Sequence, residues 1–195
     1  MTAPLIPPPD HYPIEIAGVR RHLPVVPVDG GLAIAVLNIL GDTELVDAAA
    51  RELARRLGHR SYDVLLTAEA KSIPLAHALS VVTGRPYLVL RKSYKSYMGD
   101  ALSVVTHSIT TGHEQHLYLD AKDRLTLSGR SVVLLDDVIS TGSTLEGLRA
   151  IAHEARARIV AEAAIATEGD AARWKEVIAL VHLPLFAIQP PHPPS

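Results

Sequence analysis

The sequence has no cysteine, which excludes disulfides, thiolate metal ligands and cysteine nucleophiles. Aromatic residues are only 4% of the chain, which argues against a base-stacking platform for single-stranded nucleic acid. The 19 Lys and Arg against 21 Asp and Glu leave a net charge of −2, so we expect no general electrostatic binding of nucleic acid or membrane. No run approaches the roughly 20 apolar residues of a membrane helix. The start also lacks a secretory signal pattern, so we expect a cytoplasmic protein.

The spacing of apolar residues predicts helices that alternate with strands. Helical periodicity covers residues 43–57, 73–82 and 143–156, with a short helix around 171–177. Short apolar runs predict buried strands over 63–67, 87–90, 132–135, 159–166 and 178–181. Residues 91–100 are expected to form a loop, and 101–109 and 116–119 antiparallel strands around a turn at 111–112. The alternation predicts an α/β fold with a mainly parallel central sheet flanked by helices.

Both ends of the chain are rich in proline, which fixes φ and removes a backbone donor. We therefore expect an extended or loose arm over residues 1–24 and a loose tail over 187–195. One domain is expected between them, over residues 25–186.

The segment after the most apolar run carries candidate chemistry. Asp136 and Asp137 directly follow residues 132–135, and residues 141–144 then open the next helix. In parallel sheets, ligands bind at the carboxyl ends of the strands. The turn offers consecutive backbone N–H groups, hydroxyls and the positive end of a helix dipole, which suit a phosphate. Gly142 allows a backbone conformation that a side chain would obstruct.

The two carboxylates need another partner, since they repel a phosphate. Carboxylates accept hydrogen bonds from vicinal hydroxyls and suit Mg²⁺, so a ribose carrying a 5-phosphate fits both halves of the segment. The alternative is that the acids cap a turn and the Thr-Gly-Ser-Thr stretch only starts a helix. The unbroken order of strand, acid pair, turn and helix favours a ligand site.

Residues 132–145, VVLLDDVISTGSTL, closely resemble the phosphoribosyl pyrophosphate (PRPP) signature of the type I phosphoribosyltransferases. Neither a Walker P-loop nor a Rossmann glycine pattern occurs in the sequence. The resemblance extends over about residues 30–186 and is nearest to the purine branch, the adenine and xanthine enzymes. It implies the type I phosphoribosyltransferase fold, with a small N-terminal hood at about 25–40 and a flexible flap at about 93–116.

The resemblance assigns a role to each residue of the signature. Asp136 and Asp137 would hold the ribose hydroxyls and, directly or through water, Mg²⁺. Ile139 and Ser140 would lie under the ribose and near the base, and Val138 joins them in the substrate-binding set. The 5-phosphate would be cradled by Thr141, Gly142, Ser143 and Thr144.

A short loop after the first core strand binds pyrophosphate in this family, often with a non-proline cis peptide. Residues 67–72 correspond to it, so Ala68, Ala70 and Lys71 would bind substrate. Glu69 is the best-placed acid for catalysis, the alternative being that it only braces the loop.

The basic stretch at residues 90–95 matches the family's Arg-Lys-x-x-Lys pattern. Arg91 would act as a catalytic cation, with Lys92 and Lys95 as substrate ligands. Cations over the leaving pyrophosphate stabilise the charge that develops as the C1–O bond breaks. The alternative is an ordinary solvated basic loop.

On the base side, the resemblance places Asn38 against the purine, where an amide can both donate and accept hydrogen bonds. The alternative is that Asn38 is a turn residue. Together these features predict a purine phosphoribosyltransferase of nucleotide salvage that uses Mg²⁺. Its partners would be PRPP and a purine base (adenine, or xanthine, hypoxanthine or guanine), with neither nucleic acid nor membrane, and the resemblance implies a homodimer. The alternative function is a non-catalytic, PRPP-sensing regulator with the same fold.

Overall fold

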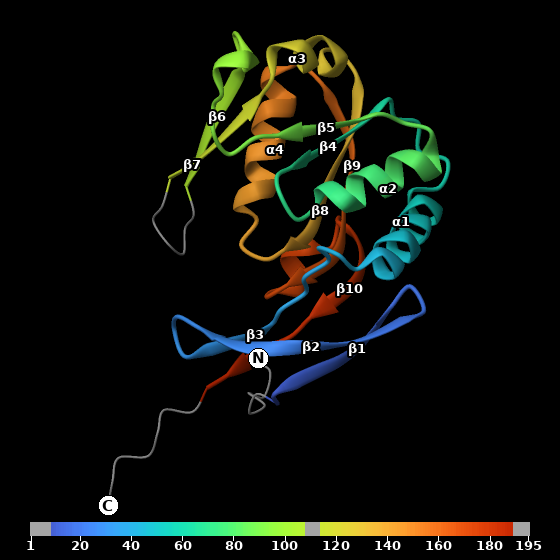
Figure 1. The fold of residues 1–195 in the computed structure, drawn as a ribbon, viewed down its shortest axis with the longest axis vertical. Helices are drawn as coiled ribbons and strands as arrows, with labels where there is room; N and C mark the ends of the chain where they lie inside the picture. Colours follow the sequence, from blue (N-terminus) through green and yellow to red (C-terminus); the bar gives the residue numbers. More distant parts are fainter. Residues whose placement is uncertain (1–8, 108–113, 189–195) are drawn as a thin grey trace, which may run out of the picture.

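The central element is a sheet of five parallel strands, seen in a computed structural model that describes residues 9–107 and 114–188 (Figure 1). In spatial order the strands are β10 (Ile178–Leu183), β9 (Arg158–Glu168), β8 (Ser131–Ile139), β4 (Val64–Ala68) and β5 (Tyr87–Leu90). Helices α1 (Thr43–Leu57) and α2 (Ile73–Thr83) cover one face, and α4 (Ser143–Glu154) covers the other. The predicted α/β fold is confirmed.

Strand β8 lies in the middle of the sheet and is apolar on both faces. Val132 and Leu134 pack on the side of α4, whereas Val133 and Leu135 pack on the side of α1 and α2. A strand covered on both faces reads as a continuous hydrophobic run, which is why the sequence identified it. The predicted end at residue 135 was too early, because the pairing of β8 with β9 continues to Ile139. The acid pair therefore lies inside the strand, near its carboxyl end.

The other predicted elements of the central layer lie within two residues of their expected bounds. Helix α1 matches its expected range, and the Asp42 side chain caps it by accepting a hydrogen bond from the backbone N–H of Leu45 at 3.2 Å. Helix α4 ends at Glu154, two residues before the expected end, since Arg156 has a φ of +56° that is incompatible with helix. The short helix expected around 171–177 is a 3₁₀ turn, η2 (Ala171–Trp174).

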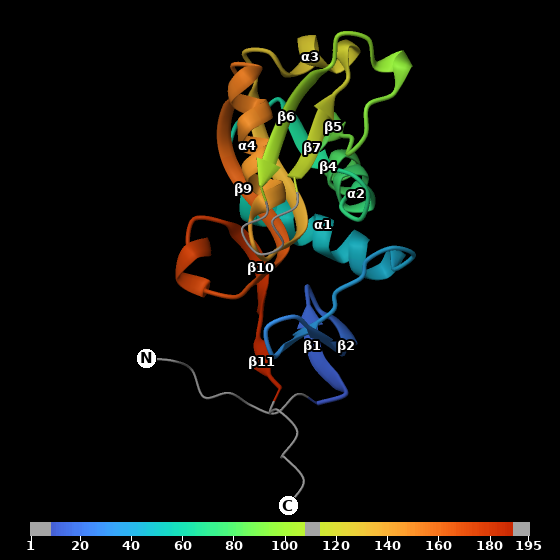
Figure 2. The same cartoon turned by 90° about the vertical axis from the view of Figure 1, so that its left-hand side faces the viewer.

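A second, antiparallel sheet lies beyond the carboxyl ends of the central strands (Figures 1 and 2). We call it the hood sheet. Its strands, in spatial order, are β1 (His11–Ile16), β2 (Val19–Val28), β3 (Leu32–Ala35) and β11 (Leu185–Ala187). The hood is therefore larger than the 25–40 segment expected, and it uses both ends of the described chain.

The proline-rich start is not a loose arm where the structure describes it. Ile14 pairs with Arg21 in a hairpin whose two-residue turn is Ala17 and Gly18, at φ values of +51° and +82°. Pro13 fits this hairpin because β1 is an edge strand, where a missing N–H does not break a ladder. Ala187, expected as the start of the tail, pairs with β3 instead. The domain limits of 25 and 186 stay a prediction.

An arginine ties the hood sheet to the start of α1, beside the apolar core that the two share. The Arg21 guanidinium donates to both carboxylate oxygens of Asp42, at 2.7 and 2.8 Å, and to Glu44 at 2.9 Å. Hydrogen bonds from this guanidinium hold the pKa of the Asp42 carboxyl below its ordinary value. Because Asp42 also caps α1, the start of that helix and the hood are fixed by one side chain.

The two antiparallel strands expected at 101–109 and 116–119 are β6 (Leu102–His107) and β7 (Glu114–Leu119). They stand beside α4 (Figure 1). The turn expected at 111–112 lies outside the described residues. The segment expected as a loop at 91–100 contains one 3₁₀ turn, η1 (Ser96–Met98). Helix α3 (Ala121–Leu127) was not predicted; its signal was Asp120, whose side chain accepts from the backbone N–H of Lys122.

Candidate active site

Two adjoining clefts lie at the carboxyl end of the central sheet. The first, of about 400 Å³, is lined by residues 68–72, Lys92, Asp136, Asp137, Val138 and Thr144. The second, of about 60 Å³, is lined by Asp136 and residues 138–145. Asp136, Val138 and Thr144 border both. All the predicted site residues line one of the two clefts, apart from Arg91, Lys95 and Asn38.

The smaller cleft is formed by the turn between β8 and α4. Gly142 has a φ of +86° and lies so close to Trp174 that a Cβ would be 2.7 Å from the indole Cη2 atom. Only glycine therefore fits this position. The Thr141 hydroxyl lies 3.3 Å from that of Ser143 and accepts from its backbone N–H at 3.4 Å. The turn directs N–H groups, hydroxyls and the start of a 12-residue helix at one point, which suits an anion.

The acid pair borders the turn. Asp136 and Asp137 are only 7% and 9% exposed, and the backbone N–H of Asp137 donates to Asp136 Oδ1 at 2.9 Å. Burial, and then the adjacent Asp137 carboxylate, raise the pKa of the Asp136 side chain. Two carboxyl groups held at low solvent exposure gain from ligand hydroxyls or a cation, because either would replace lost solvation.

The loop after β4 forms the wall of the larger cleft. Its Glu69–Ala70 peptide is cis and does not involve proline, as the resemblance implied. The Ser72 hydroxyl, 2% exposed, donates to the Ala68 carbonyl at 3.0 Å and closes the loop on itself. Ser72 was missed as a site residue, although it stands in the loop that the sequence singled out. The hydroxyl of Thr67 donates to the Leu135 carbonyl at 2.8 Å, and this bond ties β4 to β8 next to the loop and the acid pair.

Glu69 joins this loop to the basic stretch. One of its carboxylate oxygens forms an ion pair with Arg91, and the other accepts from the backbone N–H of Lys92 at 2.6 Å. The Glu69 carboxylate raises the pKa of Arg91. Arg91 is also fixed by its backbone, which exchanges hydrogen bonds of 2.8 and 2.9 Å with Tyr118 of β7. Since both Glu69 oxygens are occupied, the geometry favours the bracing role over proton transfer.

Lys95 and Asn38 are not brought to the clefts. The Lys95 side chain is exposed, and its backbone N–H donates to the Met98 sulfur at 3.3 Å at the start of η1. The exposed Asn38 side chain accepts from the backbone N–H of Leu40 at 3.3 Å, the contact of a turn residue. Their assignments to substrate stay predictions.

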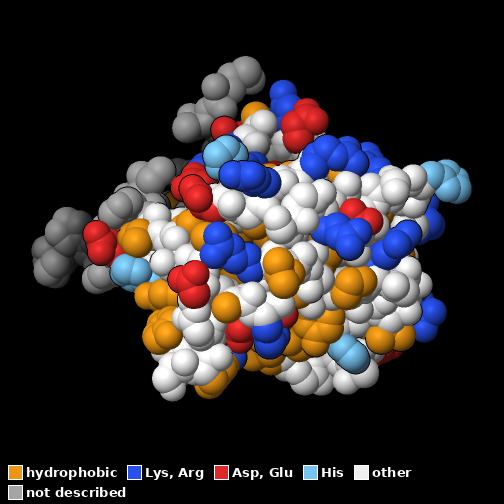
Figure 3. All heavy atoms as spheres, turned by 90° about the horizontal axis from the view of Figure 1, so that it is seen from above, with side chains coloured by type: hydrophobic (Ala, Val, Ile, Leu, Met, Phe, Trp, Pro, Cys, Tyr) orange, Lys and Arg blue, Asp and Glu red, His pale blue; other side chains and the backbone are white. Residues whose placement is uncertain are grey.

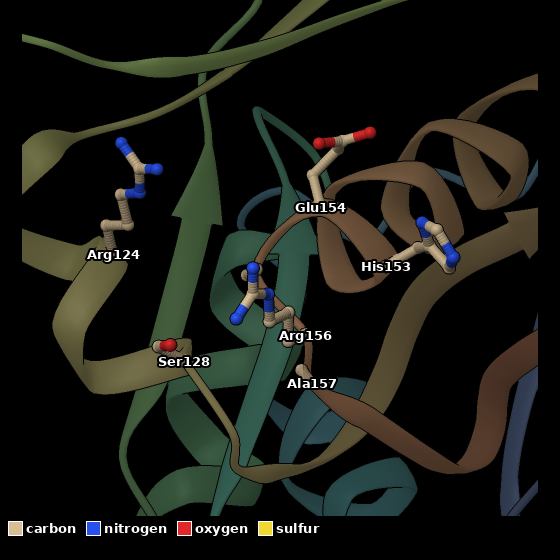
Figure 4. Close-up of a pocket in the computed structure, with 7 residues that line it drawn as sticks. Arg124, Ser128, His153, Glu154, Arg156 and Ala157 are labelled. Carbon is tan, nitrogen blue, oxygen red and sulfur yellow. The ribbon is translucent and has the colours of Figure 1, made fainter.

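Another hollow, of about 730 Å³, lies at the opposite end of α4 (Figure 4). It is lined by Arg124, Ser128 and residues 153–157 and shares none of them with the two clefts. A helix of 12 residues separates its two ends by about 18 Å, so this hollow is remote from the candidate site. The surface at the α3 end mixes basic, acidic and hydrophobic side chains without a continuous basic face (Figure 3).

Among the described residues, no group of three or more His, Asp or Glu side chains is placed to hold a metal ion. No helix in the described ranges is long and apolar enough to cross a membrane.

The family model described as "Phosphoribosyl transferase domain" matches residues 36–192. The chain belongs to this family. The family resemblance that the signature indicated is therefore confirmed, and so is the expected phosphoribosyltransferase fold.

Curated relatives carry purine names. A hypoxanthine/guanine phosphoribosyltransferase of Methanobacterium lacus is 30% identical over 131 residues, 67% of this chain and 65% of the relative. One of Methanothermobacter thermautotrophicus is 38% identical over 106 residues, 54% of this chain and 51% of the relative. A xanthine phosphoribosyltransferase of Chloroflexus aurantiacus is 34% identical over 127 residues, 65% of this chain and 59% of the relative. The phosphoribosyltransferase chain thus spans about half to two thirds of these relatives.

Solved structures share the fold at lower identity. An adenine phosphoribosyltransferase from Thermoanaerobacter pseudethanolicus matches with a TM-score of 0.69 and 19% identity, over 82% of this chain and 95% of that one. An APRTase from Giardia lamblia complexed with 9-deazaadenine gives 0.68 and 18%, over 82% and 93%. These likenesses support the phosphoribosyltransferase fold.

Proposed function

We propose that this protein transfers the 5-phosphoribosyl group of PRPP to a 6-oxopurine, with release of pyrophosphate, in purine salvage. One observation carries the proposal. The buried acid pair, the Gly142 turn and the loop that Glu69 braces meet in two adjoining clefts at one edge of the sheet. A phosphorylated ribose that carries pyrophosphate has one chemical group for each of these three parts.

In the proposed reaction, residues 141–144 bind the 5-phosphate, and Asp136 and Asp137 accept hydrogen bonds from the ribose hydroxyls. Residues 68–71 and Lys92 hold the pyrophosphate, with Arg91 braced beside them by Glu69. The bond between C1 and the pyrophosphate oxygen breaks, and its electron pair leaves with the pyrophosphate. A bond between C1 and N9 of the purine forms, and the proton of the purine N9–H passes to solvent. Positioning and stabilisation of the leaving group account for most of the catalysis.

The acid pair fits Mg²⁺ as the cofactor. Mg²⁺ keeps several waters and is bound through one or two carboxylates together with substrate phosphates, so a large cluster of protein ligands is not needed. Asp136 and Asp137 supply two buried carboxylates beside a cleft wide enough for the substrate. When bound, the ion would neutralise charge on the pyrophosphate.

The choice of 6-oxopurine follows the relatives, which are named for hypoxanthine, guanine and xanthine at 30–38% identity. The adenine enzymes among the structures match at under 20% identity and support only the fold. The predicted homodimer and cytoplasmic location remain proposals of the same kind.

The test is an assay of pyrophosphate release with PRPP, Mg²⁺ and each free base in turn. Turnover with hypoxanthine, guanine or xanthine, and little with adenine, is expected. Turnover with a pyrimidine only would contradict the proposal. Tight binding of PRPP without turnover on any base would instead support the non-catalytic regulator.

A further inference from the structure

The turn proposed to bind the 5-phosphate contains no cationic side chain. Residues 138–145 include neither Lys nor Arg, although a phosphate monoester carries a charge of about −1.5 to −2 at pH 7. The two lysines that line the clefts, Lys71 and Lys92, both belong to the larger cleft and do not border the turn. The helix dipole alone, about half a charge, leaves most of the phosphate charge uncompensated.

Arg173 lies beside this turn, although the sequence did not single it out. It stands in η2, which follows β9, the neighbour of β8 in the sheet. Its Nη2 atom is 3.3 Å from the point where a Cβ on Gly142 would be, and its guanidinium lies 4.6 Å from the centre of the Trp174 ring. The carboxyl ends of adjacent parallel strands thus bring the cation to the edge of the turn.

The support beneath Arg173 is rigid. Trp174 is 7% exposed, and its indole N–H donates to the Glu168 carbonyl at 3.0 Å. The start of η2 is fixed by Asp170, whose side chain accepts from the backbone N–H of Ala172 at 2.9 Å. The guanidinium is therefore presented on a fixed aromatic surface.

The other partner of the guanidinium is held loosely. Arg173 Nη2 lies 3.7 Å from the Glu146 carboxylate, and the two side chains are 46% and 44% exposed. An ion pair with this exposure contributes little, so a phosphate dianion can replace it at small cost.

We propose that Arg173 is the cationic ligand of the 5-phosphate, and that it exchanges Glu146 for the phosphate while Trp174 supports it. This inference rests on the proposed function for the identity of the ligand. It assigns the η2 segment, which follows the acid pair by more than thirty residues, to substrate binding.

The experiment titrates ribose 5-phosphate into the parent, R173Q and the control K175Q, and measures affinity by calorimetry. Lys175 is exposed and directly follows η2, so K175Q removes a nearby positive charge without changing a side chain close to Gly142. R173Q should bind ribose 5-phosphate about 10- to 100-fold more weakly, the loss of a charge-assisted hydrogen bond. K175Q should match the parent, and R173K should recover part of the affinity.

The tryptophan gives a second readout, since Trp174 is the single tryptophan of the chain. Its emission should change when ribose 5-phosphate binds the parent and not when Mg²⁺-pyrophosphate binds. E146Q, which removes the competing carboxylate, should bind ribose 5-phosphate more tightly than the parent.

Equal affinity of R173Q and the parent would overturn the inference, as would unchanged emission of the ligand-bound parent. If R173Q fails to fold, the inference is overturned by E146Q binding ribose 5-phosphate more weakly than the parent, or by unchanged tryptophan emission of the ligand-bound parent. If the parent binds ribose 5-phosphate but turns over no base, the proposed enzyme activity is wrong. The comparison of R173Q with the parent then still decides whether Arg173 binds the phosphate. Parent protein that binds neither ribose 5-phosphate nor PRPP would overturn both.

Discussion

Glu69 and Arg91, which are 22 residues apart in sequence, form an ion pair that joins the loop after β4 to the end of β5. The second Glu69 oxygen accepts from the Lys92 backbone at 2.6 Å. The Glu69 carboxylate therefore joins the loop and the basic stretch into one structural unit.

Replacing Glu69 should slow turnover because the basic stretch loses its fixed position. We expect E69Q to lower kcat/KM for PRPP about 10- to 100-fold, with affinity for the purine nearly unchanged. Steady-state kinetics with PRPP varied at saturating base measures this. E52Q is the control, since Glu52 also pairs with arginine side chains, those of Arg55 and Arg56, but lies on α1. Unchanged kinetics of E69Q would show that the brace is dispensable.

Removal of Arg91 should affect the chemical step directly. R91A is expected to lower kcat roughly 100-fold or more, because the cation proposed to stabilise the leaving pyrophosphate is lost, and R91K should recover part of the rate. Single-turnover measurement of pyrophosphate release separates this from binding. R85A, at the exposed start of the segment before β5, should behave as the parent. Parent-like rates for R91A would make the basic stretch ordinary surface.

Gly142 should not tolerate even alanine. A Cβ there meets Trp174 at 2.7 Å, and the φ of +86° adds strain, so G142A should lower the free energy of unfolding by about 2–4 kcal/mol. It should also abolish measurable PRPP binding. G84A is the control: Gly84 has a φ of +67° but no atom within 4 Å, so only about 1–2 kcal/mol is expected. Denaturant unfolding measures both, and equal losses would contradict the close contact with Trp174.

The acid pair predicts a pH dependence of stability. The pKa of Asp136 is raised in the folded protein, so the folded state binds a proton more tightly than the unfolded state. Without ligand, the free energy of unfolding should fall as pH rises above about 4 toward the raised pKa. D136N should therefore be more stable than the parent by roughly 1–3 kcal/mol at pH 8, and the difference should shrink at pH 5.

Denaturant unfolding at the two pH values measures this difference. The control is D47N, which removes an exposed carboxylate on α1. The double variant D136N/D137N should fold and show no turnover. A constant stability difference between pH 5 and pH 8 would contradict the raised pKa.

Local patterns predicted much of the site, because its parts are short and consecutive. Residues 136–144 follow the apolar run at 132–135, which is buried on both faces of the sheet, and the chemistry of the acids and the turn is visible in the sequence itself. The loop at 67–72 was found through the family resemblance, by its place after the first core strand. Arg173 and Trp174 were missed because their role depends on the order of strands in the sheet. Only the pairing of β8 with β9 brings η2 beside Gly142.

The hood was underestimated for a related reason. Prolines in the first 24 residues indicated a loose arm, yet Tyr12, Ile14 and Ile16 alternate as a half-buried strand does. The Ala17-Gly18 turn was the missing signal, and it is weak because alanine seldom adopts a positive φ. The pairing of β3 with β11 joins segments about 150 residues apart, which no local pattern predicts.

That pairing constrains how the hood sheet can move relative to the parallel sheet. Within residues 9–107 and 114–188, the chain crosses between the hood sheet and the parallel sheet at residues 36–42 and at Pro184. A tilt of the hood sheet must bend the backbone at these two crossings and separate the Arg21 side chain from those of Asp42 and Glu44. Under the proposed function, entry of the base and exit of the nucleotide would then depend on an ion pair that dissolved salt weakens.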